Sequence, residues 1–259
     1  MLDLTKRKRF IITSLVLSLG FLGIQFLDDR FRFLAIGALS ILTLAMFFWS
    51  LREGLGKNMT LLALVLPFMF TVGVGLFWFL LPASIFTRFP IMIFYGIGIY
   101  ALCLTTNIYT VSAIRTIALL RAARGVGFVL SLVISFLVYD TILSLRTSLP
   151  YTALLVFVSS LPLFMQGYWS IPLETEFSWK LVKMSSVASL VMAQVAISLY
   201  FWPVTVVVGS LFLTVAVYVL LGLGQARLEA RLFAQTVREY LLVGLLVFVG
   251  MLIATRWGA

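Results

Sequence analysis

The sequence predicts an all-helical bundle of about nine membrane-spanning segments without a soluble domain. Of the 259 residues, 63% are hydrophobic and 11% are charged, and the mean hydropathy is +1.15. A soluble domain cannot bury so large an apolar fraction. Short charged clusters separate the apolar runs along the whole chain, so we predict a single transmembrane domain over residues 1–259.

Apolar runs of about 17–25 residues are long enough to cross a bilayer as a helix. The first run follows KRKR (residues 6–9) and no clear small-residue cleavage site follows it, so we expect a retained first helix. The seventh and eighth runs are joined only by YFWPV, where Pro203 suits the first turn of the eighth helix. If this segment is not a turn, eight spans remain. The predicted spans are residues 10–27, 33–51, 59–81, 89–111, 125–145, 150–168, 183–201, 204–223 and 240–257.

The basic residues predict the orientation of the chain. With the N-terminus in the cytoplasm and the C-terminus outside it, 14 of the 19 Lys and Arg residues fall in cytoplasmic segments. This distribution accounts for the net charge of +10, which in a soluble chain would suggest nucleic acid. We therefore expect a multi-pass protein of the cell membrane that has no nucleic-acid partner.

One cytoplasmic segment, QARLEARLFAQTVREY, has an amphipathic pattern. As a helix it would place Arg227, Arg231 and Arg238 within about 40° on one face. A basic stripe of this kind can bind anionic lipid headgroups at the cytoplasmic face. The alternative is that the three side chains only extend from the membrane surface into the cytoplasmic water, without binding a particular lipid.

The residue counts exclude several kinds of chemistry. Histidine is absent and Cys103 is the only cysteine, which argues against metal, haem and iron–sulfur sites, so we expect no cofactor. A rhomboid-type serine protease usually needs a histidine base. The stretch VYD at residues 138–140 resembles half of the signature of intramembrane aspartyl proteases, but no GxGD follows it.

The stretch FLDDRFRF places two acids, Asp28 and Asp29, at the outer end of the first span. A paired acid in the first outer loop resembles membrane glycosyltransferases that use lipid-linked sugar donors. The resemblance implies that one of these aspartates serves as a base or a metal ligand, as it does in that family. The alternative is a helix-end charge cluster in which the acids pair with Arg30 and Arg32.

Two polar residues lie within predicted spans. Asp140 is about 15 residues from the inner end of the fifth span, or roughly 22 Å along a core of about 30 Å. An intramembrane acid is a candidate functional group, and the alternative is a structural ion pair with an outer arginine, of which Arg88 is the first choice. Asn107, near the inner end of the fourth span, can form a hydrogen bond with a neighbouring helix or bind a ligand.

Three stretches resemble uncharacterised bacterial multi-pass membrane proteins, which implies a membrane location without an assigned activity. They are AIRTIALLRAARGVGF, LYFWPVTVVVGSLFLTVAVYVLLGLGQ and RLFAQTVREYLLVGLL. We expect a non-enzymatic role: a structural or partner-binding membrane component, or one that holds lipid or another hydrophobic molecule. The alternatives are a glycosyltransferase-like enzyme and a small-solute transporter.

Overall fold

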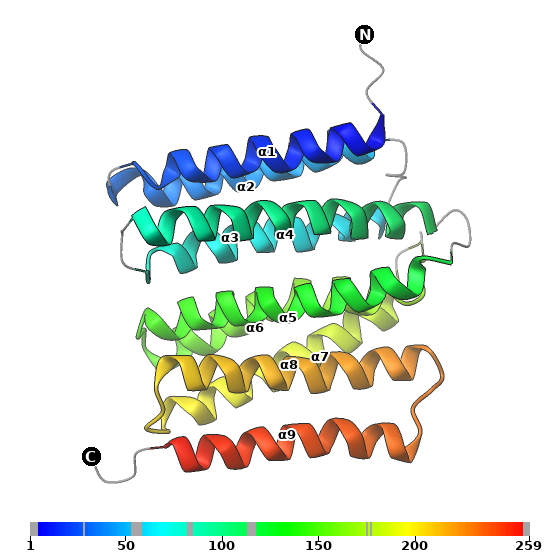
Figure 1. The fold of residues 1–259 in the computed structure, drawn as a ribbon. Coiled ribbons are helices and arrows are strands. Elements are labelled where there is room, and N and C mark those ends of the chain that lie inside the picture. The colour runs from blue at the N-terminus through cyan, green and yellow to red at the C-terminus, as the bar shows by residue number, and fades with distance from the viewer. Residues whose placement is uncertain are drawn as a thin grey trace. The chain divides into compact units, whose positions relative to one another are not determined.

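The structure is a computed structural model that describes residues 5–27, 29–52, 59–81, 85–112, 118–174, 176 and 178–255. These residues form helices and no strand, which confirms the predicted all-helical fold (Figure 1). The helices are α1 (Lys6–Ile24), α2 (Asp29–Leu51), α3 (Val65–Trp78), α4 (Ile85–Ser112), α5 (Leu120–Ser144), α6 (Leu149–Trp169), α7 (Trp179–Tyr200), α8 (Val206–Leu228) and α9 (Ala234–Ala254), and the 3₁₀ helix η1 (Met59–Leu64) precedes α3.

Within the described ranges, eight helical segments are long and apolar enough to cross a membrane. They correspond to α2 to α9, with part of η1 extending α3. The remaining helix, α1, begins with KRKR, so only its part from Phe10 to Ile24 is free of charge. At about 1.5 Å per residue this part is shorter than a typical span.

The connection between α7 and α8 confirms two separate helices where the sequence left eight spans open. α7 ends at Tyr200, and α8 begins at Val206. The prediction that Pro203 lies in the first turn of α8 is wrong, because Thr205 is the N-cap residue. Its hydroxyl accepts a hydrogen bond from the N–H of Val208 at 3.4 Å.

The chain groups into two compact units, residues 1–130 with 173–176 and residues 131–172 with 177–259. In the first unit, α1 packs against α2 and α4, and α3 packs against the same two helices. A buried chain of hydroxyls joins α2, α3 and α4: Thr43 to Thr71 at 3.1 Å, and Thr71 to Tyr95 at 2.9 Å. At Gly98 of α4 a Cβ would lie 2.3 Å from the ring of Phe70, so glycine permits this close packing.

In the second unit, α6 and α7 pack closely along a stripe of small residues on α7. Hydrogen bonds then join α6 to α8. The hydroxyl of Tyr168 donates to the carbonyl of Leu220 at 3.1 Å, and the amide of Gln225 donates to the carbonyl of Gly167 at 2.9 Å. The buried residues of the stripe are Ser185, Ser189, Ala193 and Ala196.

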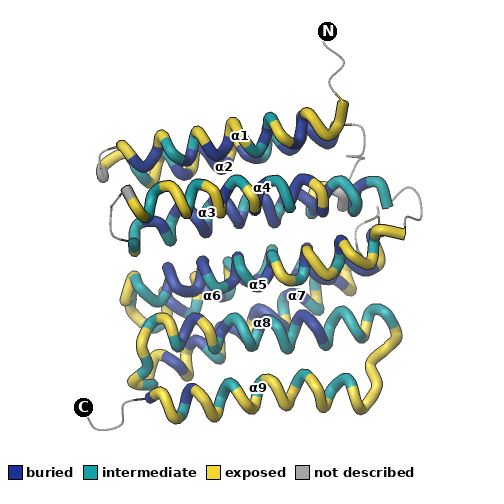
Figure 2. Tube along the Cα trace, viewed as in Figure 1, coloured by how far each residue is buried: buried dark blue, intermediate teal, exposed yellow. Residues whose placement is uncertain are grey.

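The last helix, α9, is the most exposed of the second unit (Figure 2). It packs on α8, where Gly222 leaves room for the ring of Tyr240; a Cβ would lie 2.2 Å from that ring. Met251 is the buried residue of α9. Such a large exposed apolar surface is suited to contact with lipid.

Candidate functional site

Asp140 lies near the end of α5, and its side chain is 5% exposed. The hydroxyl of Ser210 on α8 donates a hydrogen bond to Oδ1 of Asp140 at 3.0 Å. The same hydroxyl lies 3.0 Å from the carbonyl of Val207, so its proton is shared between two acceptors. A neutral hydroxyl from another helix therefore bonds one oxygen of the carboxylate.

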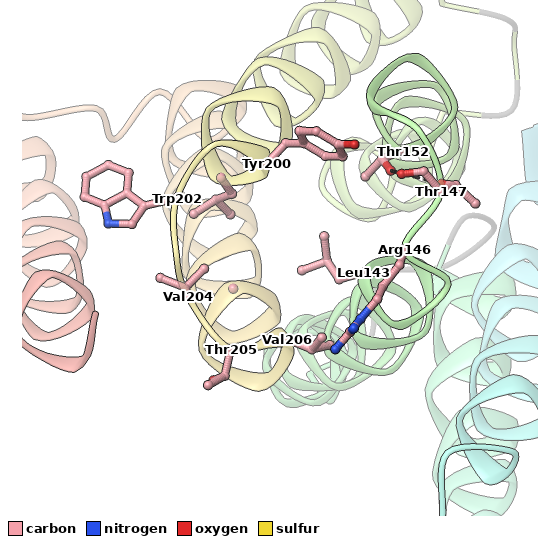
Figure 3. Close-up of a pocket in the computed structure, with 11 residues that line it drawn as sticks. Leu143, Arg146, Thr147, Thr152, Tyr200, Trp202, Val204, Thr205 and Val206 are labelled. Carbon is pink, nitrogen blue, oxygen red and sulfur yellow. Dashed lines mark hydrogen bonds between the residues drawn. The ribbon is translucent and has the colours of Figure 1, made fainter. Parts of the chain in front are cut away.

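Within the second unit, no described arginine forms an ion pair with Asp140. Arg88 belongs to the first unit, so its predicted pairing with Asp140 stays a prediction. Arg146, the nearest arginine along the chain, follows α5 in a left-handed conformation (φ 47°). Its side chain extends towards Val206 rather than back along α5 (Figure 3). The sequence placed the acid correctly near a helix end but could not identify its partner.

The Asp140–Ser210 contact joins α5 to α8. Gly209 stands next to Ser210, and a Cβ there would lie 3.1 Å from Cδ1 of Leu143 on α5, so the leucine side chain packs closely against this glycine. A serine bonded directly to a carboxylate lacks the imidazole base that activates serine in hydrolases. The geometry is therefore that of a cross-link between helices.

A cavity of about 460 Å³ lies at this end of the second unit, between the α5–α6 and α7–α8 connections. We call it the Arg146 cavity. Figure 3 shows the hydroxyl of Tyr200 pointing towards Thr147 and Thr152, whose own hydroxyls are 3.0 Å apart. No acidic side chain lines it. The lining residues are Leu143, Arg146, Thr147, Thr152, Leu199, Tyr200, Trp202, Val204, Thr205, Val206 and Gly209.

Two adjoining cavities of about 390 and 550 Å³ lie along α7, α8 and α9, and both are lined by Val191 and Leu220. Together they form what we call the α7–α9 groove. Tyr168, Lys183, Met184, Val187, Ala188, Leu223, Gly224, Arg227 and Leu232 line the first cavity, and Phe212, Val215, Ala216, Val219, Leu241, Gly244, Leu245 and Phe248 line the second.

One end of the α7–α9 groove is cationic and the rest is apolar. Lys183 lies in the second turn of α7 and Arg227 in the last turn of α8, and both side chains are exposed. Neither side chain has a hydrogen bond or an ion pair with any described residue. The nearby acid Glu229 pairs with Arg231, at a distance of 3.7 Å between their charged atoms. Two cations therefore stand at the groove without an acidic partner among the residues that the structure describes.

The predicted amphipathic helix through Arg227, Arg231 and Arg238 is wrong. α8 ends at Leu228, and Ala230 adopts a left-handed conformation (φ 56°). The N–H of Arg231 donates to the carbonyl of Ala226 at 2.8 Å, which is the hydrogen bond of a Schellman helix end. The three arginines thus fall on α8, on the connection and on α9, and a shared role in binding lipid headgroups stays a prediction.

The other predicted site residues belong to the first unit, where the structure describes only some of them. In the first unit, the guanidinium of Arg88 on α4 lies 4.6 Å from the ring centre of Phe26. Asn107 is half-buried in α4, and its backbone carbonyl accepts a hydrogen bond from Thr110 at 3.1 Å. Asp28 is outside the described residues, and Asp29 begins α2. The glycosyltransferase alternative stays a prediction.

Sequence reasoning missed Ser210 and the residues of the Arg146 cavity as a group. Ser210 follows Asp140 by 70 positions, and no pattern in a single sequence connects the two. In the sequence, Lys183 contributed only to the count of basic residues that predicts the orientation, and its place at a groove was not predicted. Among the described residues, no three His, Cys, Asp or Glu side chains gather to hold a metal ion.

Comparison with known proteins identifies the family of the chain. No curated protein and no solved structure matches it. A family model described as a protein of unknown function (DUF5656) matches residues 12–254, a range that includes the Arg146 cavity and the α7–α9 groove. This family has no assigned activity, in agreement with the resemblance seen in the sequence. The chain belongs to the DUF5656 family of proteins of unknown function.

Proposed function

We propose that this protein holds an anionic phospholipid in the α7–α9 groove. One observation carries the proposal: a single groove combines two cations that lack acidic partners with a continuous apolar wall. A phospholipid has the same division, with a charged phosphate at one end and acyl chains at the other. No catalytic constellation is needed for this role.

The cationic end supports a preference for an anionic headgroup. Arg227 offers a planar set of donors that can bind two phosphate oxygens, and Lys183 adds a second positive charge. No Asp or Glu lines either cavity. A zwitterionic headgroup would bring its own cation close to these two charges, so it should bind less tightly.

The length of the apolar wall supports a lipid as the occupant. From Arg227 to Phe212 the groove follows 15 residues of α8, which is about 22 Å. The hydrocarbon part of one leaflet is about 15 Å deep. An acyl chain whose phosphate lies at Arg227 can therefore remain in the groove over its full length, with α9 as the far wall.

The charge distribution supports a location and an orientation. We place the protein in the inner membrane of a bacterium with its N-terminus in the cytoplasm, because 14 of its 19 basic residues then lie on the cytoplasmic side. Lys183 and Arg227 are among these 14. The groove would then take its lipid from the cytoplasmic leaflet, where anionic lipids attract basic residues.

Lipid titration of the purified protein tests the proposal. Native mass spectrometry in detergent counts bound dioleoyl phosphatidylglycerol (anionic) and dioleoyl phosphatidylcholine (zwitterionic). We expect the anionic lipid to bind at least about 10-fold more tightly, because a hydrogen bond to a charged group contributes about 1.5–3 kcal/mol. Changing both cations, Lys183→Gln with Arg227→Gln, should remove this preference.

Two variants separate a groove lipid from basic side chains that merely extend into the headgroup layer. Arg231→Gln removes a nearby positive charge that is paired with Glu229, so the lipid preference should persist. Gly244→Leu places a large side chain in the apolar part of the groove and should weaken the binding of both lipids. Equal binding of the two lipids, or full preference in the double glutamine variant, would contradict the proposal.

A further inference from the structure

We propose that the Arg146 cavity binds the phosphate group of an organic phosphate. The cavity is distinct from the α7–α9 groove. Tyr200, which lines the cavity, is the last residue of α7, whereas Lys183 of the groove lies 17 residues earlier, or about 25 Å along the helix. The two sites therefore lie towards opposite ends of the same helices.

The polar groups around the cavity are suited to an anion. The guanidinium of Arg146 and the hydroxyl of Tyr200 have no hydrogen-bond partner among the described residues. Figure 3 shows these two side chains on different sides of the space, with the Thr147 and Thr152 hydroxyls beside Tyr200. The carboxylate of Asp140 is not part of the lining and is bonded to Ser210.

The arrangement of the donors favours phosphate over carboxylate. A carboxylate has two oxygens in one plane, and one arginine fork can satisfy both of them. Here donors stand on separate sides, which suits a tetrahedral group with three accessible oxygens. The volume of about 460 Å³ also exceeds the needs of a free inorganic ion and falls in the range of small-molecule sites.

The remaining walls are apolar, which suits the organic part of such a ligand. In Figure 3, Leu143 and Val206 lie beside Arg146, and Val204 lies on the α7–α8 connection. Leu199, which precedes Tyr200 in α7, also lines the cavity. The ligand can reach this cavity as a water-soluble phosphate ester or as the headgroup of a phospholipid. Both carry the same phosphate group.

The backbone at Arg146 provides a variant that keeps the fold. Its φ of 47° is the left-handed conformation that glycine adopts most readily, at the position after a helix where glycine is usual. Arg146→Gly therefore removes the cation and relieves the backbone strain together. Ala230→Gly is the matched control, because Ala230 has the same conformation after α8 and does not line the cavity.

Isothermal titration of the purified protein with glycerol 3-phosphate and with dihexanoyl phosphatidic acid tests the proposal, with acetate and glycerol as comparison ligands. We expect at least one of the two phosphates to bind, and Arg146→Gly to weaken that binding at least about 10-fold with no loss of thermal stability. Ala230→Gly should bind like the parent. Tyr200→Phe should weaken binding by a smaller factor.

Each outcome decides something. Binding of glycerol 3-phosphate indicates a water-soluble ligand, whereas binding of the short-chain lipid alone indicates a headgroup. If neither phosphate binds, or acetate binds as tightly as they do, the proposal is overturned. It is also overturned if Arg146→Gly binds with parental affinity. Loss of phosphatidylglycerol binding in the groove variants leaves this proposal unaffected, because those residues do not line the cavity.

Discussion

Ser210→Ala should destabilise the protein by about 1.5 kcal/mol, because it removes the hydrogen bond that holds Asp140. Hydrogen bonds to charged groups contribute about 1.5–3 kcal/mol in soluble proteins. Measured interhelical bonds in a membrane protein average about 0.6 kcal/mol and reach about 1.7. Asp140 and Ser210 are both buried, so water cannot replace the lost bond easily, and we expect a value in the upper part of the membrane range.

A double-mutant cycle isolates this contact. Asp140→Asn retains an oxygen that can accept from Ser210, so a neutral hydrogen bond of about 0.5–1.5 kcal/mol replaces the charge-assisted one. Alone, this variant should therefore cost no more than about 1 kcal/mol, the difference between the two bonds. With Asn at position 140, Ser210→Ala should cost less than it does in the parent, giving a coupling of about 1 kcal/mol. The free energy of unfolding is measured by reversible denaturation in mixed micelles, followed by circular dichroism.

Ser198→Ala is the control, because the Ser198 hydroxyl is exposed and bonds only within α7, to Gln194. It should change the free energy of unfolding by less than about 0.5 kcal/mol. A loss of about 3–5 kcal/mol in Asp140→Asn, partly restored by changing an arginine to glutamine, would refute the reasoning. That result is the signature of a broken buried ion pair.

Three further predictions follow from backbone geometry and charge. Ala230→Gly should raise the free energy of unfolding by about 0.5–1 kcal/mol, because a left-handed alanine costs roughly 1–2 kcal/mol; thermal denaturation measures this. Gly98→Ala should lower it by about 1–3 kcal/mol, since the added methyl group would overlap the buried ring of Phe70. In a cysteine-free background, Phe86→Cys should react with an impermeant thiol reagent on intact cells, and Glu229→Cys should not, because the basic residues predict these sides.

Each of these measurements has a control or an outcome that would contradict it. Gly37→Ala lies inside α2 with nothing within 4 Å of the new methyl group, so it should be tolerated where Gly98→Ala is not. A destabilised Ala230→Gly variant would show that the helix end does not store backbone strain. Labelling at position 229 but not at position 86 would reverse the proposed orientation.

The helices were predictable because their signal is long and local. An apolar run must be about 20 residues long to cross a bilayer, and such a run tolerates errors of a few residues at each end. The predicted span at 150–168, for example, corresponds to α6 at Leu149–Trp169. The predicted span at 10–27 corresponds to α1 at Lys6–Ile24, which begins earlier because the basic residues of KRKR are part of the helix itself.

The helix end at Ala230 was not predictable from the residue types. Glycine is the usual signal for a left-handed helix end, and here alanine takes that conformation. The pattern of basic residues continued across the break, so the segment had every local sign of one amphipathic helix. What ends α8 is the pair of backbone hydrogen bonds from Ala230 to Arg227 and from Arg231 to Ala226.

The candidate sites depended on contacts between distant residues. The partner of Asp140 is 70 residues away, and the α7–α9 groove exists only because three helices lie together. Lys183 and Arg227 each resemble an ordinary basic residue near a membrane surface. Their shared position at one groove follows from the packing of α7 on α8, which periodicity alone does not encode.

The isolation of α9 has a consequence for the order of assembly during synthesis. A chain is made from its N-terminus, so α9 enters the membrane after α7 and α8, and its main neighbour is α8. Until then, the surfaces of α7 and α8 that form the rest of the groove face the bilayer directly. A lipid already in contact with those surfaces needs no entrance path, because the arrival of α9 encloses it from the side.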